Sequence, residues 1–188
     1  MVDFATKMLA EYHNAGMHGE TWDKKYTDIG IMELHPIIRP YVFCAINKLS
    51  ELGINVRVTD WLRTFDEQDE LYAQGRKAPG RIVTFARAGE SWHNFGFAVD
   101  VVEIVAGTPM YEGPNWLQIG RIFEGFGFDW GGRWLSERQK EQLSEDEQLR
   151  AREDGDGFDR PHVQRTFGLT LESANYLHSI KKGKYITT

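Results

Sequence analysis

The hydrophobic and polar positions of this chain repeat with two different periods, and together they predict a mixture of helices and strands. Apolar residues at helical spacing predict helices over 36–51, 116–126 and 171–180, and a short helix over 4–12. Strict alternation over 54–59 is typical of a half-buried strand, and apolar segments at 82–85, 97–104 and 160–167 predict three more strands. Thr64 and Glu67 form a capping-box pattern, so we expect a further helix to begin there and to end near Gly75.

Length and composition indicate one globular domain. The chain has 188 residues, 41% of them hydrophobic, and no apolar run reaches the ~20 residues that span a bilayer. Residues 1–19 contain no apolar signal-peptide core, so we expect synthesis in the cytoplasm without standard export. The net charge of −6 comes without a basic stripe, which argues against nucleic acid as a partner. The single cysteine, Cys44, excludes an internal disulfide and is expected to be a buried thiol.

Two segments differ from the rest of this single domain, 1–188. Residues 1–30 give no clear pattern and are treated as an N-terminal extension. Residues 136–157 hold eight acidic and four basic residues, and are expected to form a solvated insertion, part helix and part flexible loop. The end of this insertion, Asp154–Gly157, has a partial calcium-loop pattern, but the full spacing is missing, so a plain acidic loop is the default.

The segment 91–100 carries the first candidate chemistry. His93 and Asp100 offer an imidazole and a carboxylate, and both are common zinc ligands. In a strand over 97–104, Ala98 and Asp100 share a face, which leaves room for a metal, and Gly96 allows a tight turn between the two ligands. Taken alone, a neighbouring His and Asp also fit a simple surface hydrogen bond.

The segment 159–162 supplies a third ligand type. Pro161 disfavours helix at Arg160, so His162 lies on extended chain. Together with His93 and Asp100 it meets the count of three protein ligands at a catalytic zinc site, which would leave Asp159 free as a general base. An isolated His162 would be read as an ordinary strand histidine. No Gly-x-Ser-x-Gly elbow, His-Glu-x-x-His helix or phosphate-binding glycine loop is found in the sequence.

Residues 91–100 resemble the Ser-x-His-x-x-Gly-x-Ala-x-Asp signature of a zinc peptidase family. That family contains D-alanyl-D-alanine dipeptidases and carboxypeptidases, and L-alanyl-D-glutamate endopeptidases of phage endolysins. Further ordered matches are similar to the endolysin branch and cover most of the chain: 34–36, Arg63 with 67–68, 71–76, 83–84, 130–132 and 159–162. The resemblance implies an α+β fold of the hedgehog and D,D-peptidase kind, with a small, mainly antiparallel sheet that carries the metal and helices around it.

The resemblance also implies roles for individual residues. One zinc per chain would be bound by His93, Asp100 and His162, with Asp159 as the general base. Arg63 would hold the substrate and polarise its scissile carbonyl. Substrate contacts are expected from Ser91, Gln68, Trp92 and Trp130, with Trp134 a further candidate for the groove, although core packing is an equal alternative for each tryptophan.

The implied function is hydrolysis of peptidoglycan stem peptides at the L-alanyl-D-glutamate bond by a monomeric, endolysin-type enzyme that a holin pore releases to the wall. A D-alanyl-D-alanine carboxypeptidase is the alternative within enzymes. A zinc-containing binding module without turnover is the alternative in another class, and Asp159 argues against it because a silent site needs no base. The long acidic 136–157 segment departs from the family pattern and leaves the specificity open.

Overall fold

The computed structural model describes residues 30–180 and confirms the mixed α+β prediction. Seven helices are described, with two short 3-10 helices and five strands. The helices are α3 (Gly30–Glu33), α4 (Arg39–Glu51), α5 (Phe65–Ala73), α6 (Trp116–Gly125), α7 (Glu137–Gln142), α8 (Glu145–Asp154) and α9 (Leu171–Ile180), with the 3-10 helices η1 (Trp92–Phe95) and η2 (Gly131–Arg133). The strands are β1 (Val56–Asp60), β2 (Ala98–Val105), β3 (Thr108–Met110), β4 (Asp129–Trp130) and β5 (His162–Gln164).

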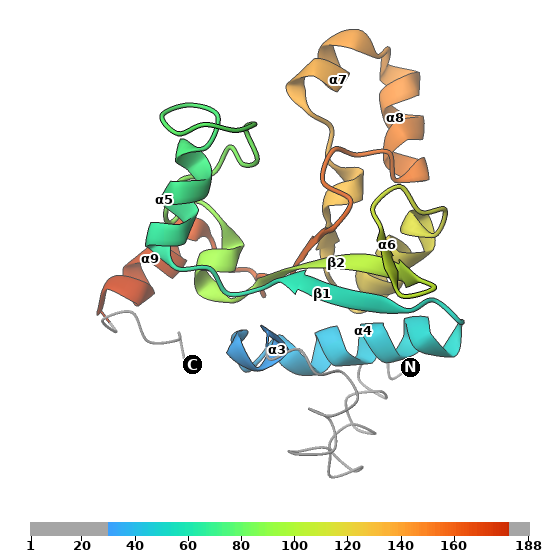
Figure 1. Cartoon of the computed structure of the whole chain (residues 1–188), viewed down its shortest axis with the longest axis horizontal. Helices are drawn as coiled ribbons and strands as arrows, with labels where there is room; N and C mark the ends of the chain where they lie inside the picture. The colour runs from blue at the N-terminus through green and yellow to red at the C-terminus, as the bar shows by residue number, and fades with distance from the viewer. Residues whose placement is uncertain (1–29, 181–188) are drawn as a thin grey trace.

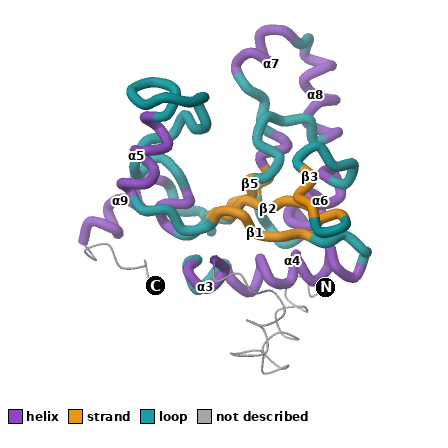
Figure 2. The backbone as a smooth tube through the Cα atoms, viewed as in Figure 1, coloured by secondary structure: helices purple, strands orange, loops and turns teal. Residues whose placement is uncertain are grey.

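All pairs in the sheet are antiparallel, as predicted, and the strand order is β1-β2-β5-β4, with β3 paired to β2. Residues that lie opposite each other in an antiparallel pair point to the same face. Val99 lies opposite Val163, and both are fully buried in the core with α4 and α6. Asp100 lies opposite His162, so these two residues share the other face. Figures 1 and 2 show α4 lying along one side of the sheet.

Two arms extend on the side of the sheet away from α4 (Figure 1). One arm consists of α5 and the irregular loop that follows it. The other is the hairpin of α7 and α8, where each helix begins with a complete capping box, at Ser136 and at Ser144. The acidic insertion is therefore more regular than predicted, because local caps stabilise two helices that bury no side chain completely. Gly155 ends α8 in the left-handed conformation, within the sequence that partly resembles a calcium loop.

Most predicted elements are confirmed, and one is wrong. The structure contains the helices predicted over 36–51, 64–75, 116–126 and 171–180, and the strands at 54–59, 97–104 and, in shorter form, 160–167. The predicted strand at 82–85 is an exposed part of the loop after α5, since it lies on an arm where no strand of the sheet is available as a partner. The helix predicted over 4–12 lies outside the described residues.

Two further expectations concern burial and membranes. Cys44 is buried on α4, as predicted. Among residues 30–180, no helix is both long and apolar enough to cross a bilayer.

Candidate metal centre and active site

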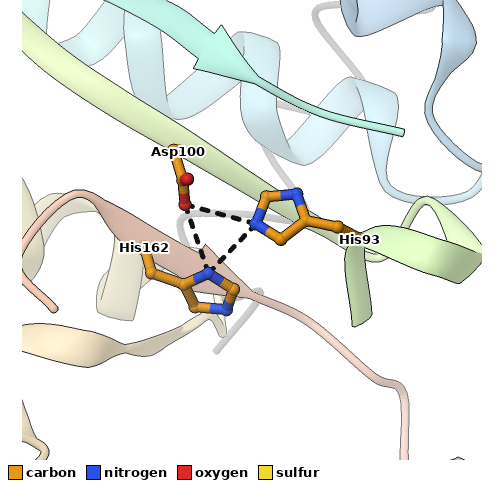
Figure 3. Close-up of side chains that lie close together, drawn as sticks. All are labelled: His93, Asp100 and His162. Atoms are coloured by element: carbon orange, nitrogen blue, oxygen red, sulfur yellow. Dashed lines mark hydrogen bonds and ion pairs between the residues drawn. The ribbon is translucent and has the colours of Figure 1, made fainter. Parts of the chain in front are cut away.

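Three elements bring His93, Asp100 and His162 together (Figure 3). Asp100 and His162 are opposite each other on β2 and β5, and His93 comes from η1 just before β2. Gly96 ends η1 with a φ of 71°, and a Cβ there would lie 2.7 Å from the His35 backbone nitrogen, so the tight turn predicted at this glycine is confirmed.

The three ligand atoms form a nearly equilateral triangle. His93 Nε2 lies 3.2 Å from Asp100 Oδ1 and 3.1 Å from His162 Nδ1, and the third side, from His162 Nδ1 to Asp100 Oδ1, is 3.2 Å. In a tetrahedral zinc site with metal–ligand distances of about 2.0–2.2 Å, neighbouring ligand atoms are about 3.3–3.6 Å apart. The triangle is only slightly smaller than one face of that tetrahedron, so a small adjustment seats the ion.

In each histidine, the hydrogen bond of the nitrogen that points away from the centre determines which nitrogen carries the proton. His93 Nδ1 lies 2.6 Å from the Trp61 carbonyl oxygen, which only accepts, so Nδ1 carries the proton. His162 Nε2 lies 3.0 Å from Gln164 Oε1 and carries its proton for the same reason. In the neutral rings, two lone pairs and a carboxylate oxygen of Asp100 therefore face one another. That arrangement requires a cation, so these residues fit zinc.

The titration of these groups also favours positive charge at the centre. Burial alone would raise the pKa of Asp100, but hydrogen bonds and charge from His162 and His93 hold that pKa far below its usual range. Burial likewise opposes protonation of His162, yet the hydrogen bond and charge of Asp100 raise the pKa of this imidazole. Within residues 30–180, this is the only group of three or more metal-type ligands that converges in this way.

Asp159 lies beside the centre without joining the triangle. Burial raises the pKa of Asp159, and the charges of His162, Asp100, His93 and Arg63 all act on it. Gly131 allows this segment to come close, because a Cβ there would lie 2.2 Å from the Asp159 carbonyl oxygen. A carboxylate of raised pKa next to a metal position suits a general base.

Arg63 borders the site and is held firmly. Its guanidinium donates from Nη1 to Gln68 Oε1 at 2.7 Å and from Nη2 to Asp60, and its side chain is only 12% exposed. The Arg63 backbone nitrogen also donates to the His93 carbonyl oxygen. These bonds fix Arg63 next to His93, a candidate metal ligand.

The residues expected to contact substrate lie mostly behind the site. Gln68 is fully buried, and its amide nitrogen donates to the Ala86 carbonyl oxygen at 2.7 Å, so it supports Arg63 and does not face a substrate. Trp92 and Trp130 are buried in the two core clusters, so the core alternative is correct for both. Ser91 caps η1, with Oγ accepting from the His93 backbone nitrogen, and thereby orients a ligand.

Sequence reasoning missed the residues that support His162 from outside. Gln164 Nε2 donates to Asp129 Oδ2 at 3.3 Å, and Trp134 Nε1 donates to Asp129 Oδ1 at 3.2 Å. The Trp134 ring lies 5.1 Å from the His162 ring, so it flanks the site as one of the three candidate tryptophans. Gln164 could have been found from the sequence, because it follows His162 by two residues on a strand and so shares its face.

Comparison with known proteins connects this geometry to peptidases. A family model described as D-alanyl-D-alanine carboxypeptidase matches residues 85–140. Peptidoglycan L-alanyl-D-glutamate endopeptidase CwlK of Bacillus subtilis (strain 168) is 40% identical over 112 residues, which cover 54% of this chain and 67% of CwlK.

Two solved structures are also similar. The L-Ala D-Glu endopeptidase ChiX of Serratia marcescens is 22% identical with a TM-score of 0.49, and the match covers 76% of this chain and 88% of ChiX. A mutant of the vancomycin-resistance D,D-pentapeptidase VanY in complex with Zn(II) is 18% identical with a TM-score of 0.48, and the match covers 78% of each chain.

Proposed function

Because this chain belongs to the D-alanyl-D-alanine carboxypeptidase family of zinc peptidases, we propose that it hydrolyses peptidoglycan stem peptides at the bond between L-alanine and D-glutamate. The observation that carries the proposal is the convergence of His93, Asp100 and His162 on a position that needs a cation, with Asp159 beside it. The choice of bond is supported by the endopeptidase CwlK, the 40% identical relative.

His93, Asp100 and His162 would hold zinc, which would act as a Lewis acid that polarises a carbonyl and lowers the pKa of a water molecule to about 7. Asp159 takes the proton of the attacking water on a carboxylate oxygen and returns it to the amine that leaves. Burial raises the pKa of Asp159, which makes its carboxylate a stronger base.

Arg63 is proposed to hold the substrate and to stabilise negative charge on the scissile carbonyl oxygen. Its ion pair with Asp60 and its bond to Gln68 keep the guanidinium in place before substrate binds, so little reorganisation is needed. Trp134 flanks His162 and is proposed as an apolar wall for the peptide.

We further propose an endolysin-type role, in which the monomeric enzyme is made in a bacterial cytoplasm and reaches the wall through a holin pore. The support for this finer assignment is the similarity of Arg63 with 67–68, and of segments 71–76, 83–84 and 130–132, to the endolysin branch. To test this role, the zinc-loaded protein is added to intact and to permeabilised cells. Lysis should occur only where the protein can reach the wall, either past the membrane from inside or after outer barriers have been removed.

Mass analysis of digested, purified peptidoglycan tests the bond. Cleavage as proposed releases stem peptides that begin with D-glutamate and leaves L-alanine on the glycan. Loss of only the terminal D-alanine, with stems still attached, would replace the proposal by the second candidate, a D,D-carboxypeptidase, which the description of the matched family favours. Zinc binding without release of either product would identify a silent binding module.

A further inference from the structure

The loop after α5 is strongly basic, although the chain as a whole is acidic. Residues 75–89 contain Arg76, Lys77, Arg81 and Arg87 and no acidic residue, whereas the whole chain has a net charge of −6. All four basic residues are exposed. The other arm, α7–α8, has the opposite character, with eight acidic and four basic residues in 136–157. We name residues 75–89 the basic loop.

Two of the four cations are held in place by one ring. The Arg76 guanidinium lies 4.0 Å from the centroid of Tyr72, and the Arg87 guanidinium lies 5.0 Å from the same centroid. Arg76 Nη1 also donates to the carbonyl oxygens of Tyr72 and Thr84. Cations fixed in this way lose less side-chain entropy when they bind an anion.

The other two cations, Lys77 and Arg81, are available to a partner. Within residues 30–180, neither side chain makes a hydrogen bond, ion pair or ring contact. Ile82, Val83 and Phe85 of the same loop are also exposed, and the 77% exposed Phe85 ring lies 5.6 Å from the Arg76 guanidinium. A loop that combines free cations with an exposed ring is typical of a surface that binds an anionic partner with apolar parts.

The basic loop is attached directly to the site. Gln68 donates to the Ala86 carbonyl oxygen inside the loop and accepts from Arg63 at the site border. One buried side chain therefore links the loop to the residue that borders the site. Long irregular loops in compact domains usually serve a function of this kind.

We propose that the basic loop binds carboxylates on stem peptides that neighbour the one in the active site, and so holds the enzyme on its insoluble substrate. This inference rests on the proposed function. The carboxylates come with that substrate, because a glutamate linked through its γ-carboxyl keeps its α-carboxylate free. Repeated anions of this type match the four cations, and arginine pairs well with carboxylates. The acidic α7–α8 arm repels the same groups and so directs the polymer to the basic loop.

Co-sedimentation of the zinc-loaded full chain with insoluble wall at 4 °C measures this binding. The double variant Lys77→Glu/Arg81→Glu should bind wall on the order of tenfold more weakly, because two of the proposed exposed ion pairs with wall carboxylates become contacts between like charges. The matched control Arg138→Glu/Arg150→Glu makes the same change in charge on the α7–α8 arm and should bind wall as the unaltered chain does. Cleavage of a soluble stem peptide should be unchanged in both variants.

Chemical treatment of the wall separates two sources of anions. Wall whose phosphodiester-linked polymers have been removed with hydrofluoric acid should still bind, whereas wall whose carboxylates have been coupled to ethanolamine should not. Equal binding by both double variants, or loss of binding after the acid treatment alone, would overturn the proposal. If the soluble peptide is not cleaved by the unaltered chain, the proposed function fails, and the wall-binding result stands as a separate outcome.

Discussion

One face of the short sheet packs in the core and the other carries the candidate metal site, and neighbouring residues on each strand point to opposite faces. On β2 and β5, Val99 and Val163 are fully buried against the helices, while Asp100 and His162, one position away, converge on the metal position. A shift of one residue in the pairing would exchange the two faces. The core face therefore fixes the register that brings the ligands together, and the site depends on the core more than the core depends on the site.

This comparison predicts that removal of zinc abolishes activity and leaves the fold in place. The ligands are held by the sheet register and by the carbonyl of Trp61, which do not require the ion. Chelation should reduce hydrolysis of peptidoglycan to the background rate, added zinc should restore it, and circular dichroism should show the same secondary structure throughout. Full activity after verified zinc removal would exclude a metal mechanism.

The second prediction concerns the base beside the site face. Asp159→Asn preserves shape but removes the proton acceptor, so kcat should fall about 10²–10⁴-fold. Zinc content should stay the same, because Asp159 is not one of the three converging ligands. Thermal stability should not fall, because the raised pKa of Asp159 means that its ionised carboxylate opposes folding at neutral pH. Asp154→Asn, at the exposed end of α8, is the control and should leave kcat unchanged. Near-normal turnover of Asp159→Asn would show that another group activates the water.

A substitution on the core face should lower stability and leave the zinc affinity of the folded protein unchanged. Phe123 on α6 is fully buried in the cluster that contains Val99 and Val163. Phe123→Ala should lower the free energy of unfolding by about 3–5 kcal/mol, as measured by urea denaturation. The fraction that remains folded should bind zinc with unchanged affinity, measured by competition with a chromophoric chelator. A large loss of zinc affinity in that fraction would contradict the division between the faces.

Part of the division between core face and site face could be predicted from the sequence, and part could not. The sequence predicted that His93, Asp100 and His162 would act together, and the structure brings these three residues together, because a metal site needs particular residue types in a recognisable order. The roles of Gln68, Trp92 and Trp130 were not, because burial depends on which segments pack against them, and the pattern at these positions fits either a groove or a core. The segment 82–85 looked like a strand because apolar composition alone does not show whether a partner strand is near.

The next prediction concerns Gln164, whose side chain contacts the outer nitrogen of His162. It accepts the Nε2 proton of His162 and so presents Nδ1 to the metal. Gln164→Ala should weaken zinc binding about 10–100-fold, with little change in stability. Gln142→Ala on the exposed α7 removes a similar side chain from a helix and is the control. Unchanged zinc affinity in Gln164→Ala would mean that another contact fixes the tautomer of His162.

The smallest effect is expected at the start of α5, where fold and site meet. Thr64 follows Arg63 and shares a capping box with Glu67, whose carboxylate accepts from the Thr64 backbone nitrogen at 2.8 Å. This hydrogen bond lowers the pKa of Glu67 below its ordinary value of 4.5, so the ionised form stabilises the folded state. That stability is complete above the unfolded value and is lost as the pH falls through the lowered folded value.

Glu67→Gln should therefore be slightly less stable than the unaltered chain at pH 7. The difference in melting temperature should shrink as the pH falls below about 4.5, the unfolded value. Thr64→Ala removes the cap itself and should lower the free energy of unfolding by about 1 kcal/mol at every pH. Because α5 also carries Gln68, which supports Arg63, both variants should raise KM more than they lower kcat if the cap helps to hold Arg63 in place. A constant melting-temperature difference for Glu67→Gln from pH 7 to pH 3 would show that its charge contributes nothing to the cap.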